Sequence, residues 1–199
     1  MTIRKGQDWG QKTTVPPDFV TARTDASVAD AWRSRIVPLL SGGNLHSSLG
    51  HPPPKNTGQD CMRFQVDALE VTVTAKGGTN TFVAASDVVV GRWMRGDFAL
   101  VSANGRWAGL DIAPRSHPND GALHVLRIPP KVSLRQRLAA RRRAALGTHV
   151  PHPEISVTKG ESFEMARSSR QPLTVDGLDA GSWESVVVRI LPDHAEVMA

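Results

Sequence analysis

Ser102–Leu123, with the sequence SANGRWAGLDIAPRSHPNDGAL, is the stretch that decides the fold. It carries two turn sequences, Asn104-Gly105 and Asn119-Asp120-Gly121, around short apolar segments. Asparagine, aspartate and glycine tolerate the backbone conformations of tight turns, so both sequences predict turns between strands. The stretch is therefore expected to lie in a β-hairpin region.

The residues on either side extend the β pattern. Between residues 69 and 75 apolar side chains alternate with Glu70, Thr72 and Thr74, which is the period of a half-buried strand. The sequence KGGTN at residues 76–80 predicts a hairpin turn, because the spacing of a phosphate-binding loop is absent and no helical pattern follows. Further short apolar runs, separated by Gly, Pro, Asn and Asp, lie at residues 98–102, 123–128, 155–158, 163–166, 173–175 and 186–191. The fold class predicted is mainly β, a two-sheet β-sandwich or a related barrel.

Two segments have helical patterns instead. In residues 26–37 apolar side chains recur every four positions behind Thr24 or Asp25 as N-cap, which predicts an amphipathic helix. A second helix is predicted over residues 134–146, with Ser133 as N-cap and Gly147 ending it. We expect Leu134 and Leu138 of this helix to face the core.

The proline-rich sequence HPPPKNTG at residues 51–58 has the composition of a linker. It divides the chain into an N-terminal helical segment, residues 1–60, and a β-sandwich domain, residues 61–199. No run approaches the roughly 20 apolar residues of a membrane span, and the N-terminus lacks an apolar signal stretch, so a cytoplasmic location is expected. Cys61 is the only cysteine, which excludes an internal disulfide and a cysteine-cluster metal site.

The positive charge is concentrated in one segment. The chain has a net charge of +5, and residues 131–143, KVSLRQRLAARRR, carry one Lys and five Arg without an acid. This segment accounts for more than the whole net charge. A local patch suits a docking surface better than a nucleic-acid groove, which usually spreads positive charge over a whole face.

Three motif regions give the chain a resemblance. Asn104-Gly105-Arg106, Ala113-Pro114 and Asp120-Gly121-Ala122-Leu123 are followed by GTHVPHP at residues 147–153 and PLTVDG at residues 172–177. In this order they resemble the C-terminal lobe of the diacylglycerol kinase and sphingosine kinase-like lipid kinases, over roughly residues 62–199. The resemblance implies a β-sandwich lobe beside an ATP-binding lobe with a Gly-Gly-Asp-Gly-Thr loop. That loop has no match here and the first 60 residues are too few for that lobe, so no ATP binding is expected from this chain alone.

One fragment resembles a second loop of the nucleotide lobe. Residues 38–50 are similar to the family pattern Gly-Thr-Gly-Asn-Asp-x-Ala-Arg-x-Leu-Gly. With Asn44 as helix N-cap, Gly42 and Gly43 would present backbone N–H groups to an anion. The alternative is a glycine-rich turn into a short helix, with Leu45 and Leu49 packed inward.

The resemblance also implies a metal site. Carried onto this chain, it places a structural Mg²⁺ on the Asp120 carboxylate and the backbone oxygens of His117 and Ala122. The alternative is a solvent-facing turn, because Asn-Asp-Gly forms turns without a metal. His149 and His152 suggest zinc, but the neighbouring prolines and the missing third ligand favour a role in shaping the strand that starts near Ile155.

The position of the family's general base is occupied by Leu178. A lipid hydroxyl must lose a proton as it attacks the γ-phosphate, and leucine cannot accept that proton. Asp176 and Asp179 are adjacent, but a shift of one residue in a strand or turn points a side chain to the opposite face. No other catalytic motif is found, so no catalytic residue is assigned and the chain is expected to be a degenerate, non-catalytic lipid kinase-like protein.

Three functions remain in competition. The first is binding of a lipid or acidic ligand, or docking on a protein partner, a second copy or an anionic membrane at the inner membrane surface. Residues 92–95, with Arg92, Trp93 and Arg95, would form an amphipathic lip for it. The basic helix would supply Arg135, Arg141, Arg142 and Arg143. The second is a lipid kinase completed by another chain that supplies the ATP lobe. The third and weakest is nucleic-acid binding through residues 131–143.

Overall fold

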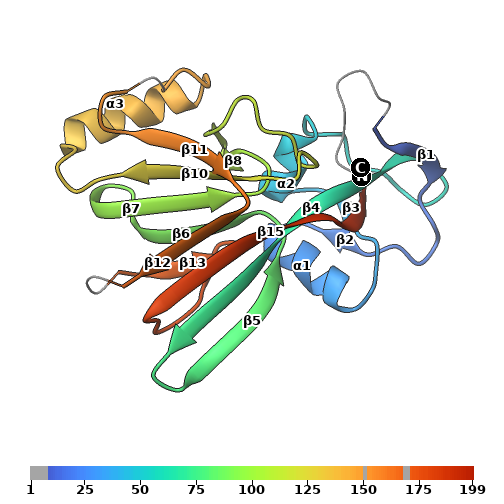
Figure 1. Cartoon of the computed structure of the whole chain (residues 1–199). Helices are drawn as coiled ribbons and strands as arrows, with labels where there is room; N and C mark the ends of the chain where they lie inside the picture. The colour runs from blue at the N-terminus through green and yellow to red at the C-terminus, as the bar shows by residue number, and fades with distance from the viewer. Residues whose placement is uncertain (1–8, 150–151, 168–170) are drawn as a thin grey trace.

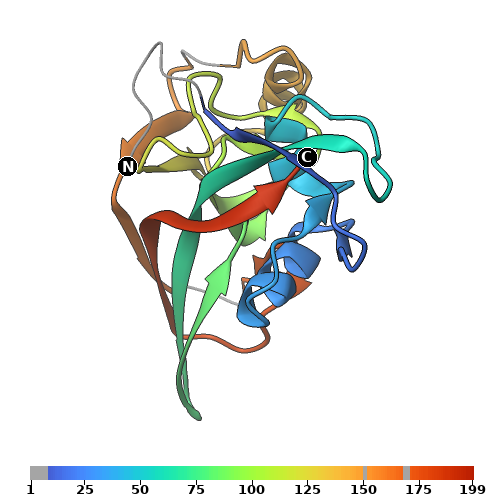
Figure 2. The same ribbon diagram turned by 90° about the vertical axis from the view of Figure 1, so that its right-hand side faces the viewer.

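The computed structural model describes residues 9–149, 152–167 and 171–199. The protein is mainly β, with two large sheets packed face to face and three helices around them (Figure 1). This confirms the predicted sandwich. In Figure 2 the long strands of one sheet cross in front, and α1 lies beside β5.

The seven-stranded sheet is built on two long antiparallel strands, β4 (Asp60–Ala75) and β15 (Ser185–Met198). Its order is β1-β4-β15-β3-β2, with β5 also pairing with β4 and β12 with β15. The bounds are β1 (Gln11–Thr14), β2 (Thr21–Ala22), β3 (Leu39–Leu40), β5 (Gly78–Ala84) and β12 (Ser162–Ala166). The strands β1, β2 and β3, which come from the first 60 residues, therefore belong to one of the two sheets of the sandwich.

The six-stranded sheet has the order β11-β10-β7-β6-β13-β14. Its strands are β6 (Asp87–Arg92), β7 (Arg95–Ser102), β10 (Leu123–Ile128), β11 (Ser156–Gly160), β13 (Leu173–Val175) and β14 (Leu178–Asp179). A small hairpin of β8 (Arg106–Trp107) and β9 (Leu110–Asp111) lies within the stretch quoted first. The two turn sequences of that stretch do connect strands.

Apolar residues fill both faces of the six-stranded sheet. Val88, Val101 and Leu123 pack with Val71 of the facing sheet, around the buried Trp183. On the outer face Phe98 and Leu126 belong to a second apolar cluster that includes residues of helix α3 (Leu134–Ala144). A strand buried on both faces needs a continuous apolar run, and β6 and β7 have one.

The N-terminal segment forms a small βαβ unit. Helix α1 (Asp25–Arg33) connects the parallel strands β2 and β3, and the short helix α2 (Gly43–Ser48) follows. The N-cap of α1 is Thr24, which forms a reciprocal capping box with Ser27. The helix stops at the Ser34 C-cap, so it is shorter than the predicted 26–37.

Helix α3 starts after its Ser133 N-cap as predicted, but it presents a different face to the sheet. Leu134 is 51% exposed and Leu138 is 43% exposed, so the prediction that they face the core was wrong. Arg137 is buried instead, together with Ala140 and Ala144. Small side chains allow the helix to approach the sheet closely, and the buried arginine is satisfied by backbone oxygens, as described below. In the described part of the chain no helix is long and apolar enough to cross a membrane.

Candidate functional site

Two buried aspartates, Asp25 and Asp87, and the half-buried Asp176 meet where α1, α2 and the six-stranded sheet come together. We call Asp25, Asp87 and Asp176 the aspartate cluster. Asp25 is the first residue of α1, and its carboxylate accepts hydrogen bonds from the backbone N–H groups of Asn44 at 2.7 Å and Leu45 at 3.0 Å. The N-terminus of α2 is thus paired with a carboxylate of the same chain, which the positive end of a helix favours.

Asp176 reaches the cluster through a tight hairpin. Asp176 and Gly177 form the two-residue connection between β13 and β14, with φ values of +49° and +81°, as a type I′ turn requires. The Asp176 carboxylate accepts hydrogen bonds from the backbone N–H groups of Ala85 at 2.7 Å, Ser86 at 2.9 Å and Asp87 at 3.1 Å. It therefore fixes the connection between β5 and β6.

Asp87 and Asn44 complete this arrangement. Asn44 donates from Nδ2 to the Asp87 carboxylate at 2.8 Å and accepts from the Ala108 N–H at 2.9 Å. Burial raises the pKa of Asp87 to about 7, and the neighbouring Asp176 and Asp25 act in the same direction. Burial also raises the pKa of Asp176 to about 6 and raises that of Asp25. Close carboxylates with pKa values near neutrality are a feature of functional sites and of buried structural clusters alike.

The residues predicted to bind an anion lie at this cluster. The N-cap of α2 is Gly42, not Asn44 as expected, and α2 has Leu45 buried on its inner side. A Cβ atom on Gly43 would come within 2.6 Å of the Asp25 carboxylate, so glycine at this position permits the close approach. Since the N–H groups of Asn44 and Leu45 already donate to Asp25, an external anion would have to displace it.

Asp25 was not identified from the sequence, although a signal was present. The sequence Arg23-Thr24-Asp25-Ala26-Ser27 places an acid in the middle of a strand-to-helix connection. This sequence does not match the Gly-Gly-Asp-Gly-Thr pattern of the lipid kinases. The partners of Asp25, Asn44 and Leu45, lie 19 and 20 positions away, so no local pattern indicates them.

Leu178 lies at the edge of a hollow next to the cluster. The hollow has a volume of about 130 Å³ and lies between α1, β5 and the β13–β14 hairpin, lined among others by Ala29, Phe82 and Asp176. Leu178 is 63% exposed, and Asp179 is exposed with its carboxylate accepting from the Gly181 N–H at 2.8 Å. Asp176 is less exposed than Asp179, and the backbone N–H groups of residues 85–87 donate to its carboxylate.

The residues expected to hold Mg²⁺ do not fit a cation well. Asp120 Oδ2 pairs with Lys159 Nζ at 3.1 Å and with His124 Nε2 at 3.2 Å. Its Oδ1 accepts from the Ala122 N–H at 3.1 Å, and the His117 carbonyl accepts from the Asp120 N–H at 3.1 Å. Lysine and histidine lower the pKa of Asp120, although burial opposes them. A metal ion at Asp120 would have to displace Lys159, so we assign no metal-binding role to these residues.

A second hollow lies beneath α3, on the outer face of the six-stranded sheet. It is narrow, about 30 Å³, and its walls are apolar, lined among others by Phe98, Trp107, Leu126 and Ala140. His149 also lines it and is only 2% exposed. Neither ring nitrogen of His149 has a hydrogen-bond partner among the described residues. Burial lowers the pKa of His149, although the Ile112 backbone and Asp111 oppose this, so the ring is neutral at pH 7.

The other predicted ligand residues border this hollow. Trp93 lines it, and Arg141 stacks over the Trp93 ring at 4.8 Å. Arg92 and Arg95 flank Trp93 in the β6–β7 turn, while Arg135, Arg142 and Arg143 lie on the outer side of α3. His152 lies elsewhere, and its Nδ1 accepts from the N–H groups of Glu154 and Ile155 at 3.1 Å, as expected for a residue that shapes the start of β11. No cluster of three metal-ligating side chains occurs in residues 9–149, 152–167 and 171–199.

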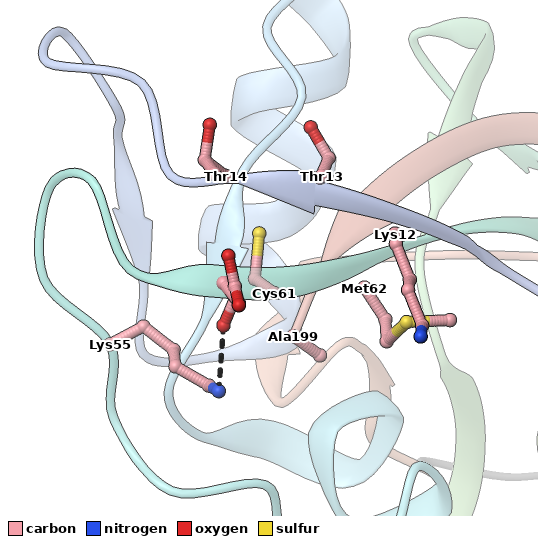
Figure 3. A pocket seen from close by; sticks show the side chains of 8 residues that line it. Lys12, Thr13, Thr14, Lys55, Cys61, Met62 and Ala199 are labelled. Atoms are coloured by element: carbon pink, nitrogen blue, oxygen red, sulfur yellow. Dashed lines mark hydrogen bonds between the residues drawn. The ribbon is translucent and has the colours of Figure 1, made fainter.

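Another hollow, of about 600 Å³, lies apart from all of these residues. It lies beside β1 and the start of β4, and Figure 3 shows Lys12, Thr13 and Thr14 around it. Lys55 donates to the Asp60 carbonyl at 2.8 Å, and Cys61 is buried. Burial raises the pKa of the Cys61 thiol, so the thiolate is disfavoured. This hollow contains no arrangement with recognisable chemistry.

Comparison with known proteins identifies the domain. The profile of the YegS C-terminal NAD kinase beta sandwich-like domain matches residues 59–199. Because this match covers more than half of the chain, the protein belongs to that family. It has a kinase-like C-terminal domain related to diacylglycerol and NAD kinases.

One solved structure shows a similar fold. A candidate diacylglycerol kinase from Bacillus anthracis strain Sterne superposes with a TM-score of 0.54 at 13% identity, over 90% of this chain and 76% of that chain. A second diacylglycerol kinase structure from that strain has a TM-score of 0.49 at 12% identity, over 90% and 74%. Yeast NADH kinase complexed with NADH has a TM-score of 0.43 at 11% identity, over 69% and 44%. No curated protein matches the sequence.

Proposed function

We propose that this protein is a non-catalytic relative of the lipid kinases that binds a lipid of the diacylglycerol class beneath α3. The observation that carries the proposal is the apolar hollow with His149, whose two ring nitrogens have no hydrogen-bond partner among the described residues. The lipid class is suggested by the name of the Bacillus anthracis diacylglycerol kinase with the same fold.

The chemistry of the hollow suits a lipid with one polar group. A buried polar group without a partner costs about 1–3 kcal/mol, and a bound hydroxyl or ester carbonyl would recover much of that cost. The neutral imidazole of His149 offers one donor and one acceptor. An acyl chain would contact the aromatic and aliphatic walls, and because the hollow is only about 30 Å³ it would enter by displacing side chains that line it.

Two features support the absence of phosphoryl transfer. Leu178 occupies the position at which the related kinases have a glutamate base, and the Asp25 carboxylate pairs with the α2 N–H groups that would otherwise face a phosphate. These losses are independent, because one concerns the proton acceptor and the other the nucleotide.

Native mass spectrometry after incubation with a short-chain diacylglycerol tests the proposal. The wild-type chain should retain one lipid. Ala140→Phe fills the hollow and should abolish retention, whereas Ala139→Phe, on the exposed side of the same helix, should not. His149→Leu should raise the stability of the lipid-free protein by about 1 kcal/mol and weaken lipid binding at least tenfold. Equal retention by the two phenylalanine variants would refute binding in this hollow.

Phosphoryl transfer with a partner-supplied ATP lobe is a second candidate. The raised pKa values of Asp87 and Asp176 favour it, since a base with a pKa near 7 is effective at neutral pH. It predicts transfer of labelled phosphate from ATP to diacylglycerol, and loss of that transfer in Asp87→Asn. Labelling by the purified chain alone would overturn the non-catalytic proposal.

A further inference from the structure

The outer side of α3 and the adjoining β6–β7 turn form one continuous surface, which we call the α3 surface. Its apolar members are Met94, Leu134, Leu138 and Leu146, and its basic members are Arg92, Arg95, Arg135, Arg141, Arg142 and Arg143. The turn and the helix lie on the same side of the molecule (Figure 1).

Exposed apolar side chains gather on this surface. Met94 is 55% exposed and Leu146 is 80% exposed, in addition to Leu134 and Leu138. In the described part of the chain seven large apolar side chains are exposed, and four of them belong to the α3 surface. Such a concentration marks an interaction site rather than the scattered exposure that any surface has.

The basic side chains of the surface are not neutralised. Across the described ranges of the chain, none of its six arginines forms an ion pair with a carboxylate, and Glu154 pairs instead with Lys131 at 2.5 Å. A surface with free positive charge beside exposed leucine and methionine matches negative headgroups above an apolar layer.

A buried arginine holds the surface together. Arg137 is 1% exposed and donates from Nε to the Val132 carbonyl at 2.9 Å and from Nη1 to the Trp93 carbonyl at 3.0 Å. Its Nη2 donates to the carbonyls of Gly96 at 2.6 Å and Pro129 at 2.8 Å. One guanidinium thus joins the β6–β7 turn, the loop before α3 and the helix, so the two parts present their side chains as one rigid face.

We infer that the α3 surface docks on an anionic phospholipid bilayer, with the leucines and Met94 at the level of the acyl chains and the arginines at the headgroups. Nucleic acid would also attract the arginines, but it offers nothing to exposed leucine side chains. The inference rests on the surface and not on the hollow, so the proposed lipid binding and the membrane docking can fail separately.

Vesicle co-sedimentation of the full chain tests the inference. One set of vesicles is phosphatidylcholine, and a second contains one-third phosphatidylserine. Binding should be at least tenfold stronger to the second set and should weaken as salt rises. Each arginine near the surface contributes roughly fivefold. The double variant Arg142→Glu/Arg143→Glu should lower binding at least tenfold, while Lys76→Glu, in the exposed turn between β4 and β5, should leave it unchanged.

The leucines separate a membrane from nucleic acid. Leu134→Ser/Leu138→Ser should lower binding to the phosphatidylserine vesicles severalfold with an unchanged melting temperature, and Leu178→Ser, an exposed leucine outside the surface, is the matched control. If the serine variant binds vesicles like the wild type, or if the chain binds duplex DNA more tightly than these vesicles, the inference is wrong. His149→Leu, beneath the helix and outside the α3 surface, should bind vesicles normally even when its lipid binding is weakened.

Discussion

The aspartate cluster and the α3 surface both collect charged residues, but only the aspartate cluster satisfies its charged groups within the chain. Backbone N–H groups donate to Asp25 and Asp176, and Asn44 donates to Asp87. On the α3 surface the arginines have no carboxylate partners among the described residues, and in the same part of the chain the ring nitrogens of His149 have no hydrogen-bond partner. The polar groups around the N-terminus of α2 are therefore paired with one another, whereas those on the side carrying α3 can still bind a ligand.

The largest expected effect comes from the residue that assembles the α3 surface. Arg137→Met removes four hydrogen bonds to backbone carbonyls and leaves those oxygens buried, which should lower the free energy of unfolding by about 3 kcal/mol or more. Arg135→Met, two residues away and exposed, should change it by less than about 0.5 kcal/mol. Urea unfolding of both variants checks this, and similar midpoints would show that Arg137 is dispensable.

The aspartate cluster should make stability depend on pH. The pKa of Asp87 rises from 3.8 to about 7 on folding, so the folded state binds a proton that the unfolded state releases. Stability should therefore fall as pH rises from about 4 to about 7. The Asp87→Asn variant lacks this dependence on pH. Its free energy of unfolding should exceed that of the wild type by on the order of 2 kcal/mol at pH 8 and should show no advantage at pH 4.

Comparing the two proteins across pH isolates Asp87 from the histidines. Burial lowers the pKa of His117 and His149, so these histidines make stability rise with pH, opposite to the effect of Asp87. Their contribution is the same in the wild type and in Asp87→Asn. Thermal unfolding between pH 4 and pH 8 provides the measurement. A constant difference between wild type and variant at every pH would mean that Asp87 is not protonated in the folded state.

The helix cap within the cluster gives the next effect. Asp25→Ala leaves the N–H groups of Asn44 and Leu45 without an acceptor, which should cost about 1–2 kcal/mol. Asp30→Ala on the exposed side of α1 loses only the surface ion pair with Arg33 and should cost much less. Added phosphate should partly restore the stability of Asp25→Ala and not that of the wild type, because only the variant leaves the α2 terminus free.

The smallest effect is expected at Asp120. Lys159→Met removes a partly exposed ion pair and should cost at most about 1 kcal/mol. Because Lys159 and His124 already pair with the Asp120 carboxylate, added Mg²⁺ or a chelator should leave the melting temperature of the wild type unchanged. A rise in melting temperature with Mg²⁺ would support the metal site that the family resemblance implies.

Much of the sandwich could be predicted from local patterns. Alternation between residues 69 and 75 gave the faces of β4, and the capping sequences at Thr24 and Ser133 gave the starts of α1 and α3. The face of α3 could not be predicted in this way, because leucines at 134 and 138 look like a core stripe while Arg137 looks like a surface residue. Burial of Arg137 depends on carbonyls from the β6–β7 turn region as well as from the loop before α3, and no local pattern contains that information.

The candidate site shows the same division. The sequence by itself determined the strand pattern, the motif order that marks the lipid kinase-like lobe, the leucine at position 178 and the concentration of positive charge in residues 131–143, since each is a property of residue type and spacing. Only the tertiary structure decided that Asp25 pairs with the α2 terminus, that three aspartates meet at one site, and that leucines join the arginines on one open face. These depend on distances between segments far apart in the chain, and burial and hydrogen bonding set the energy of a charge only once those distances are fixed.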